Sequence, residues 1–156
     1  MLDNNRLTLD KTVDVLKAAG EPTRLRLLSL LMGGDLTVTD LTEILGQSQP
    51  RISRHLKLLT EAGLIERYQE GAWAYFRLSG DGRAFALARQ IIDAVSPSDA
   101  LLARDGERLQ AVKQARAERA QAYFSQNAAR WDRLRSLHIS DAQVEAALME
   151  MVGNTP

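Results

Sequence analysis

Residues 47–78, QSQPRISRHLKLLTEAGLIERYQEGAWAYFRL, decide the fold of this chain. They begin with a turn in which Ser48 is suited to cap a helix and Pro50 is tolerated in the first helical turn. The apolar residues of one helix face then recur at three- and four-residue steps, at Ile52, Leu56 and Leu59. The stretch therefore predicts a helix that ends near Ala62.

A β-hairpin is predicted directly after this helix. Gly63 fits the glycine that ends a helix. The segments 64–69 and 73–78 are rich in aromatic, β-branched and alternating residues. The pair Glu70-Gly71 interrupts them, which indicates a turn at the tip of a hairpin.

Three helices are predicted ahead of the quoted stretch and one after it. The first two cover residues 9–19 and about 22–32, with Pro22 near a first helical position. Thr37 and Asp40 resemble a capping box for the third, which ends at Gly46. Asp81 is a cap for a fifth helix, residues 83–95. This order predicts a mainly α protein with a small β-hairpin, arranged as a winged helix-turn-helix.

Ser96-Pro97-Ser98 marks a domain boundary. We expect residues 1–95 to form the winged helix-turn-helix domain, and residues 96–156 a C-terminal helical extension. From Asp99 to about residue 137 the chain is rich in Ala, Arg, Glu and Gln, and it predicts one long helix or two. Ser140 is suited to cap a last short helix.

Composition limits the functional classes. The 20 basic and 20 acidic residues balance, so a contact with nucleic acid must come from a local cluster. The absence of cysteine excludes disulfides and thiolate metal sites, and two histidines are too few for a His-rich metal cage. We expect no cofactor. No signal peptide or membrane-spanning run is visible, which predicts a soluble, cytoplasmic protein without membrane contact.

The predicted helix after Ser48 has the side chains that a reader of the major groove needs. In a winged helix-turn-helix this second helix of the pair enters the groove by its N-terminal part. Gln can pair with adenine and Arg with guanine, while Ser48 and the helix N-terminus offer donors to phosphate. The outward residues are Gln49, Arg51, Ser53, Arg54 and Lys57. Between Gln47 and Lys57 there are three positive charges and no negative one. Taken alone, such a cluster is also the ordinary solvated face of an amphipathic helix.

The hairpin has the character of a DNA-contacting wing. Arg67, Gly71 and Arg77 give it charge and a flexible tip, and such wings lie along the backbone or the minor groove. Glu66 and Glu70 would repel phosphate, so part of the wing is expected to point away from DNA.

The roles of four further residues are less directly indicated. His55 lies next to the buried line of its helix, and a phosphate contact and a packing or capping role remain open for it. For Trp73, Tyr75 and Phe76 we expect packing in the core and wing rather than stacking on bases.

The segment that contains the predicted helices and the hairpin closely resembles the ArsR/SmtB family of dimeric bacterial repressors. The resemblance rests on LKAAGEPTRLRLLSLL, on LTVTDLTEILGQSQPRISRHLKLLTEAGLIERYQEGAWAYFRL and on the helix that follows, about residues 10–95. It implies a homodimer built on the first and fifth helices that binds an inverted-repeat operator near its own promoter. Carried over by position, the recognition helix holds Ser48, Gln49, Arg51, Ser53, Arg54 and His55, and the wing holds residues from Arg67 to Tyr75. On the wing, Arg67, Gly71 and Tyr75 are the candidate DNA contacts.

The sequence departs from the metal-sensing members of that family. Those members use cysteines beside the recognition helix, or His and Asp pairs on the fifth helix. Here the corresponding segments read TDLTEILG and GRAFALARQIIDAV. We therefore expect no metal response through these sites.

Residues 108–156 resemble the segment that opens a methyltransferase domain in ArsR-type regulators fused to one. In those fusions a Gly-rich site for S-adenosylmethionine follows, and no GxGxG motif occurs in this chain. One interpretation is a remnant of such a fusion whose effector is an S-adenosyl compound. The other is that the extension enlarges the dimer interface or covers the core. Candidates for a small-molecule pocket are Tyr123, Phe124, Trp131 and Arg135, although such a helical stripe is also typical of packing.

The sequence thus predicts a homodimeric, sequence-specific DNA-binding regulator that represses transcription, is not an enzyme, and is released by a signal other than a metal. Two alternatives remain. The chain could be the regulatory part of an S-adenosylmethionine-dependent methyltransferase fusion, or an interaction module whose long C-terminal helix recruits a partner.

Overall fold

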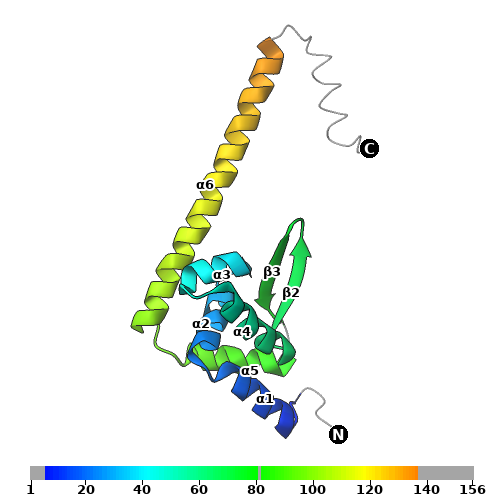
Figure 1. Cartoon of the computed structure of the whole chain (residues 1–156), viewed down its shortest axis with the longest axis vertical. Coiled ribbons are helices and arrows are strands. Elements are labelled where there is room, and N and C mark those ends of the chain that lie inside the picture. Colours follow the sequence, from blue (N-terminus) through cyan, green and yellow to red (C-terminus); the bar gives the residue numbers. More distant parts are fainter. Residues whose placement is uncertain (1–5, 81, 137–156) are drawn as a thin grey trace. The chain divides into compact units, whose positions relative to one another are not determined.

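The computed structural model describes residues 6–80 and 82–136, and the side chains of the last helix up to Arg133 (Figure 1). The chain divides into two compact units, residues 1–112 and 113–156. The elements in chain order are α1 (Leu9–Ala19), α2 (Pro22–Met32), β1 (Leu36–Thr37), α3 (Val38–Leu45), α4 (Gln49–Glu61), β2 (Ile65–Glu70), β3 (Trp73–Leu78), α5 (Gly82–Asp93) and α6 (Ala100–Ser136). No described helix has the length and apolar character needed to cross a bilayer.

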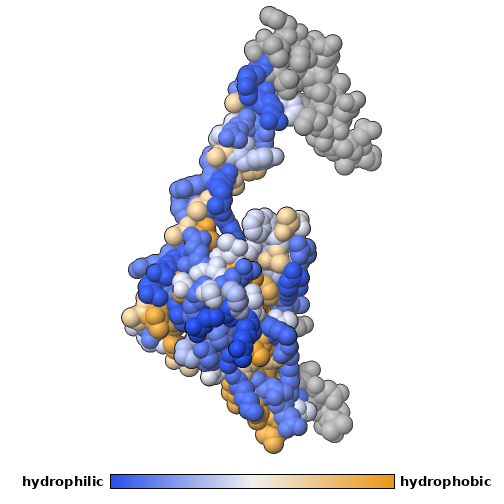
Figure 2. All heavy atoms as spheres, viewed as in Figure 1, coloured by the Kyte–Doolittle hydropathy of each residue, from blue (hydrophilic) through white to orange (hydrophobic). Residues whose placement is uncertain are grey.

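Helix α1 is confirmed, but its apolar residues divide between the core and the solvent. Thr8 caps the helix by accepting from the Lys11 backbone N–H. Val15 and Ala19 are buried, at 0% and 2% exposure. The other apolar positions of the helix stay exposed, namely Leu9, Val13 and Leu16. Figure 2 shows apolar surface at the end of the molecule where Figure 1 places α1.

The helix-turn-helix forms as the sequence predicts. The capping box is complete, because the Thr37 hydroxyl accepts from the Asp40 backbone N–H and the Asp40 carboxylate accepts from that of Thr37. Gly46 ends α3 in the left-handed conformation, at φ 66°. Ser48 then caps α4. The predicted apolar line of α4 is fully buried, at Ile52, Leu56 and Leu59.

The β-structure is larger than the predicted hairpin. Strands β2 and β3 form that hairpin, with Gly71 at its tip in the left-handed conformation, at φ 61°. Strand β1 adds a third, antiparallel strand, in which Leu36 pairs with Phe76 and Thr37 with Tyr75. The sequence analysis missed β1 because two residues are too few to display a strand period.

The extension begins inside the first compact unit. The stretch predicted as one long helix or two is a single helix, α6. Its first turns join the core, since Leu109 and Val112 are buried together with the carboxylate residue Asp105. The unit therefore continues past the expected boundary at residue 96 to Val112. The predicted cap at Asp81 and the last short helix after Ser140 lie outside the described residues.

Candidate nucleic-acid interface

Helix α4 presents a basic face to the solvent. Because Ile52, Leu56 and Leu59 anchor its opposite side in the core, the polar residues between them must point outward. All five residues predicted to point outward are exposed, namely Gln49, Arg51, Ser53, Arg54 and Lys57. From Gln49 to Lys57 this face carries three cations and no acid, so it is locally positive on a chain without net charge.

One row of this face borders a groove. Gln49, Ser53 and Lys57 follow one another at four-residue steps and line a hollow of about 700 Å³ between α4 and the hairpin. Arg67 and Trp73 line it from the hairpin. The start of α3, residues 37–39, closes it on a third side, a contribution that sequence patterns alone did not reveal. The groove therefore joins the recognition helix and the wing into one continuous surface, in which polar side chains border an apolar floor that includes Leu56 and Phe76.

The Ser48 side chain caps its own helix, α4. Its hydroxyl oxygen accepts from the Arg51 backbone N–H at 3.4 Å, as expected of an N-cap. The hydroxyl hydrogen is still available for donation, since a hydroxyl carries both functions. Its predicted contact with phosphate is thus restricted to donation.

His55 is turned toward α2 rather than outward. Its Nδ1 lies 3.1 Å from the Arg24 guanidinium and 3.8 Å from the Glu21 carboxylate. Burial lowers the pKa of His55 below its usual 6.5; the positive charges of Arg24, Arg51 and Arg54 lower it further, and Glu21 opposes the shift. A neutral ring that accepts from Arg24 suits these surroundings. This geometry favours the packing role among the two roles left open for His55.

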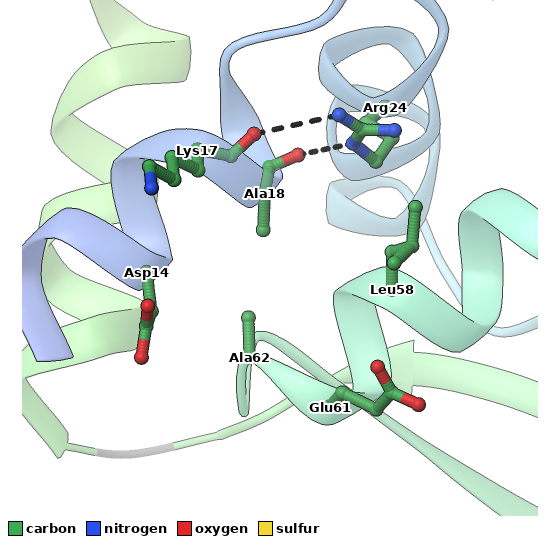
Figure 3. A pocket seen from close by; sticks show the side chains of 7 residues that line it. All are labelled: Asp14, Lys17, Ala18, Arg24, Leu58, Glu61 and Ala62. Atoms are coloured by element: carbon green, nitrogen blue, oxygen red, sulfur yellow. Dashed lines mark hydrogen bonds between the residues drawn. The ribbon is translucent and has the colours of Figure 1, made fainter.

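Arg24 connects α1 with the recognition helix. Its guanidinium donates to the Lys17 and Ala18 carbonyls at the end of α1 (Figure 3). It also meets His55 on α4. A cavity of about 390 Å³ lies beside it, between α1 and α4. Lys11 makes a second link, because its ammonium donates to the Ala62 carbonyl at 2.8 Å. Sequence reasoning missed Arg24, because nothing distinguishes one arginine at a helix N-terminus from a solvated one.

The wing has two different faces. Strand register pairs Arg67 with Phe76 and Tyr68 with Tyr75, so alternate pairs lie on opposite sides. Arg67 is on the groove side, where Phe76 is buried as expected. Trp73 contradicts the expectation that it packs, because 56% of it is exposed. It lies at the edge of the groove and was not among the predicted DNA contacts.

On the opposite face of the wing, the side chains contact one another. Tyr75 stacks on Tyr68, with ring centroids 5.5 Å apart, and Arg77 lies over the Tyr68 ring. The Tyr68 hydroxyl donates to Asp35 at 2.6 Å, and this hydrogen bond raises the pKa of Tyr68 to about 12. Arg77 also pairs with Glu66 at 3.4 Å. The structure therefore separates Tyr75 from Arg67, although both were predicted DNA contacts.

The predicted small-molecule residues of the second unit are only partly described. Tyr123 and Phe124 are 63% and 69% exposed and meet edge to face at 6.0 Å. Trp131 is half-buried, and the Arg135 side chain lies outside the described residues. A pocket at these residues stays a prediction. Among the described residues, no three His, Asp or Glu side chains group in a way that would hold a metal ion.

Comparison with known proteins identifies the family. Residues 21–67 match the model of the bacterial regulatory protein family arsR. The arsenic resistance transcriptional regulator ArsR1 of Pseudomonas putida is 39% identical over 103 residues, covering 62% of this chain and 80% of that protein. The chain belongs to the ArsR family. The arsenical resistance operon repressor of Escherichia coli, another relative, is 44% identical over 82 residues, 52% of this chain and 68% of that one.

Solved structures of similar regulators agree with this ArsR-family fold. The homodimeric winged helix-turn-helix DNA-binding domain from Mycobacterium bovis is 26% identical at a TM-score of 0.52, covering 63% of this chain and 90% of that one. The transcriptional repressor BigR from Xylella fastidiosa is 27% identical at a TM-score of 0.50, covering 54% and 82%. This ArsR-family protein is accordingly a DNA-binding transcriptional regulator with a winged helix-turn-helix, and the family is one of regulators rather than enzymes.

Proposed function

We propose that this protein represses transcription as a homodimer, and that each protomer reads one half of an inverted-repeat operator with α4. The observation that carries the proposal is the basic face of α4 from Gln49 to Lys57, which holds no acid and is kept outward by three fully buried apolar residues. Gln49 and Arg54 are the base readers in this scheme, since amide and guanidinium groups pair with adenine and guanine edges. Repression is the activity named for several relatives.

The wing completes the proposed interface on one face only. Arg67 and the exposed Trp73 border the groove next to α4, and together with the Gly71 tip of the hairpin they would follow the DNA backbone or minor groove. Ser48, Arg51, Ser53 and Lys57 supply the remaining contacts, mostly to phosphate. Tyr75 and His55 act indirectly, through the wing stack and through Arg24.

Two observations support the homodimer. The exposed apolar residues of α1 form an open stripe on a helix that touches α5. A stripe of this kind is normally covered by a protein surface. The Mycobacterium bovis domain that resembles this chain is itself homodimeric. The cytoplasm is the compartment in which such a regulator would meet its operator.

Fluorescence anisotropy on the chain's own upstream DNA tests this function. We expect specific binding, a steep decrease of affinity with salt, and a clear preference over scrambled DNA of the same length. Arg54→Ala is expected to weaken the specific complex and to reduce that preference, while Glu43→Ala on the exposed surface of α3 serves as control. Equal, weak binding to both DNAs would overturn the proposal.

The S-adenosyl effector is a separate hypothesis. It comes from the likeness of residues 108–156 to fused methyltransferases, and the comparisons lend it no support. Isothermal titration of the protein with S-adenosylmethionine and S-adenosylhomocysteine decides it, since an absence of heat of binding removes the hypothesis without affecting the repressor proposal.

A further inference from the structure

A second cavity lies away from the DNA-binding face and within the first compact unit. It has a volume of about 360 Å³ and is enclosed by the start of α2, the end of α5 and the first turn of α6. Its apolar lining comes from Pro22, Leu25, Ile92, Val95, Leu101 and Leu102. Leu101 is 47% exposed, although it is a leucine beside an apolar hollow. The volume falls at the small end of the usual range for ligand sites, roughly 300–1,000 Å³.

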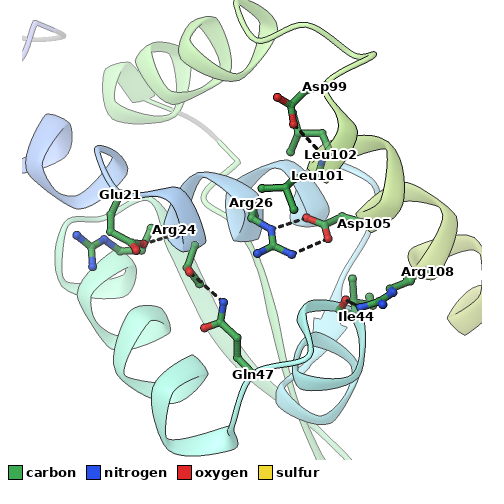
Figure 4. Close-up of polar contacts among 11 residues, drawn as sticks. Glu21, Arg24, Arg26, Ile44, Gln47, Asp99, Leu101, Leu102, Asp105 and Arg108 are labelled. Carbon is green, nitrogen blue, oxygen red and sulfur yellow. Dashed lines mark hydrogen bonds and ion pairs between the residues drawn. The ribbon is translucent and has the colours of Figure 1, made fainter.

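The charged groups around this cavity are already paired with protein atoms. Arg26 donates from Nε and a terminal nitrogen to both carboxylate oxygens of Asp105, at 2.8 and 2.9 Å (Figure 4). Asp99 accepts from the Leu101 and Leu102 backbone N–H groups at the start of α6. Glu21 accepts from the Arg24 backbone N–H.

The chemistry of the lining therefore selects the kind of ligand. A charged molecule would compete with these pairs and would lose its hydration, which is costly. Ser29 adds one neutral hydroxyl to the wall. The lining suits an uncharged, mainly apolar molecule with at most one hydrogen-bonding group.

The same elements reach the turn that sets the recognition helix. On α6, one turn beyond Asp105, the Arg108 guanidinium donates to the Ile44 carbonyl at 2.9 Å, in the last turn of α3. From the other side, Gln47 in the turn donates to the Thr23 hydroxyl of α2 at 3.1 Å. The cavity thus lies between α2 and α6. These two elements contact Gln47 within the turn and Ile44 just before it (Figure 4). A change in their spacing would alter how α4 is presented.

We propose that the cavity between α2, α5 and the start of α6 binds a small uncharged apolar molecule, and that its occupancy changes DNA affinity through Arg108 and the turn before α4. The second part rests on the proposed function, because it requires specific DNA binding. The ligand alters DNA affinity only to the extent that it binds one of the two forms, free or DNA-bound, more tightly.

Binding is tested on the full chain with N-phenyl-1-naphthylamine, an uncharged aromatic probe that fluoresces in apolar surroundings. We expect a saturable signal at one probe per chain. Leu101→Asp is expected to weaken binding of the probe at least about tenfold, because it places a carboxylate at the apolar wall of the cavity. The fold should tolerate it, since Leu101 is partly exposed and an acid is favourable in the first turn of a helix. Ala117→Asp, which adds the same carboxylate to the exposed surface of α6 outside both candidate pockets, is the control and should bind the probe normally.

A second variant fills the cavity with a bulky side chain instead of placing a charge at its wall. Ser29→Phe is expected to lose the probe while keeping a cooperative melt. Unchanged probe binding in both Leu101→Asp and Ser29→Phe overturns the site, as does the absence of saturable binding. Loss of the signal in Trp73→Ala would place the probe in the groove beside α4. Dissociation of dimers by the probe, seen in light scattering, would identify the cavity as an interface between copies. Either result also overturns the site.

The coupling is measured by DNA anisotropy with and without saturating probe. We expect a change in specific DNA affinity of about fivefold or more, absent in Leu101→Asp. Arg108→Ala should abolish the change without loss of probe binding, and Arg108→Lys should restore it because an ammonium can also donate to the Ile44 carbonyl. Specific DNA binding that ignores a bound probe overturns the coupling. A protein that binds no DNA specifically overturns the proposed function instead, and the probe titration still decides the site.

Discussion

Helices α1 and α4 are both amphipathic, but they leave opposite kinds of surface exposed. On α4 the apolar line is buried at 0–1% exposure, and the predicted reading residues from Gln49 to Lys57 are exposed and basic or polar. Its one large exposed apolar side chain, Leu58 at 38%, lines the cavity beside α1. On α1 the core takes Val15 and Ala19, and a second apolar row stays outside, with Leu9 at 81%, Leu16 at 47% and Val13 at 38%.

This difference separates two kinds of partner. A basic face without apolar side chains gains little from a protein surface and much from phosphate. An open apolar row gains most from burial against another protein surface. The two helices are nevertheless connected, through Lys11 and through Arg24 with His55. Dimer formation and DNA reading are therefore expected to depend on each other.

The largest expected effect follows from charging the apolar row. In the double variant Leu9→Asp, Val13→Asp we expect the dimer to dissociate, because burying two carboxylates in an apolar interface is costly. Specific DNA affinity should then fall about a hundredfold or more, since two half-sites are no longer bound together. Light scattering and anisotropy measure the two effects, with Glu43→Ala on the exposed surface of α3 as control. A variant that remains dimeric would mean that α1 does not form the interface.

The next largest effect is expected on stability, from a substitution on the buried side of α4. Ile52→Ala removes a side chain with 0% exposure, and we expect the free energy of unfolding to fall by about 2–5 kcal/mol. Urea denaturation measures it. The matched change Ser53→Ala, one residue along on the exposed face, should leave stability nearly unchanged. Equal losses in the two variants would contradict the orientation of the helix.

A smaller effect is expected on the exposed side. Gln49→Ala should cost about 1–3 kcal/mol of specific binding and relax the choice of one base pair, since a base contact is lost. Lys57→Ala should instead weaken binding to all sequences alike and reduce the salt dependence. Binding to a panel of singly substituted operators distinguishes the two. If Gln49→Ala lowers the affinity for every operator in the panel equally, Gln49 contacts the DNA backbone rather than a base.

The smallest effect concerns the link between the two helices. Because the folded protein lowers the pKa of His55, it binds fewer protons than the unfolded chain below the usual value of 6.5. The free energy of unfolding should therefore decrease as the pH falls through 6.5 toward the lowered pKa. His55→Gln should lose this component, and the difference between the two pH profiles isolates it because His138 is present in both. Superimposable profiles would show that His55 has no such shift.

Much of the interface was predictable because its signals are local. Ser48, the line from Ile52 to Leu59 and Gly63 fix where α4 begins, which side it buries and where it ends. The capping box of Thr37 and Asp40 does the same for α3. The family resemblance added what local patterns could not, namely the expectation of a dimer and an operator.

Other features depended on contacts distant in sequence. Strand β1 is visible only because Phe76 and Tyr75 pair with it. The direction of His55 was decided by Arg24, 31 residues earlier, and the role of Arg24 was not predicted at all. The split of the wing into two faces likewise needed the register of β2 against β3.

By itself, the sequence determined the order of the helices and hairpin, the basic face of α4 and the absence of thiolate chemistry. Caps, periodicity and composition act within a few residues and are legible without the fold. Only the tertiary structure decided that the first turns of α6 belong to the core, where Asp105 is buried against Arg26, 79 residues away in the sequence. It also decided that a cavity lies between α2, α5 and the start of α6. The physical reason is that a buried ion pair and a cavity exist only where separate segments meet.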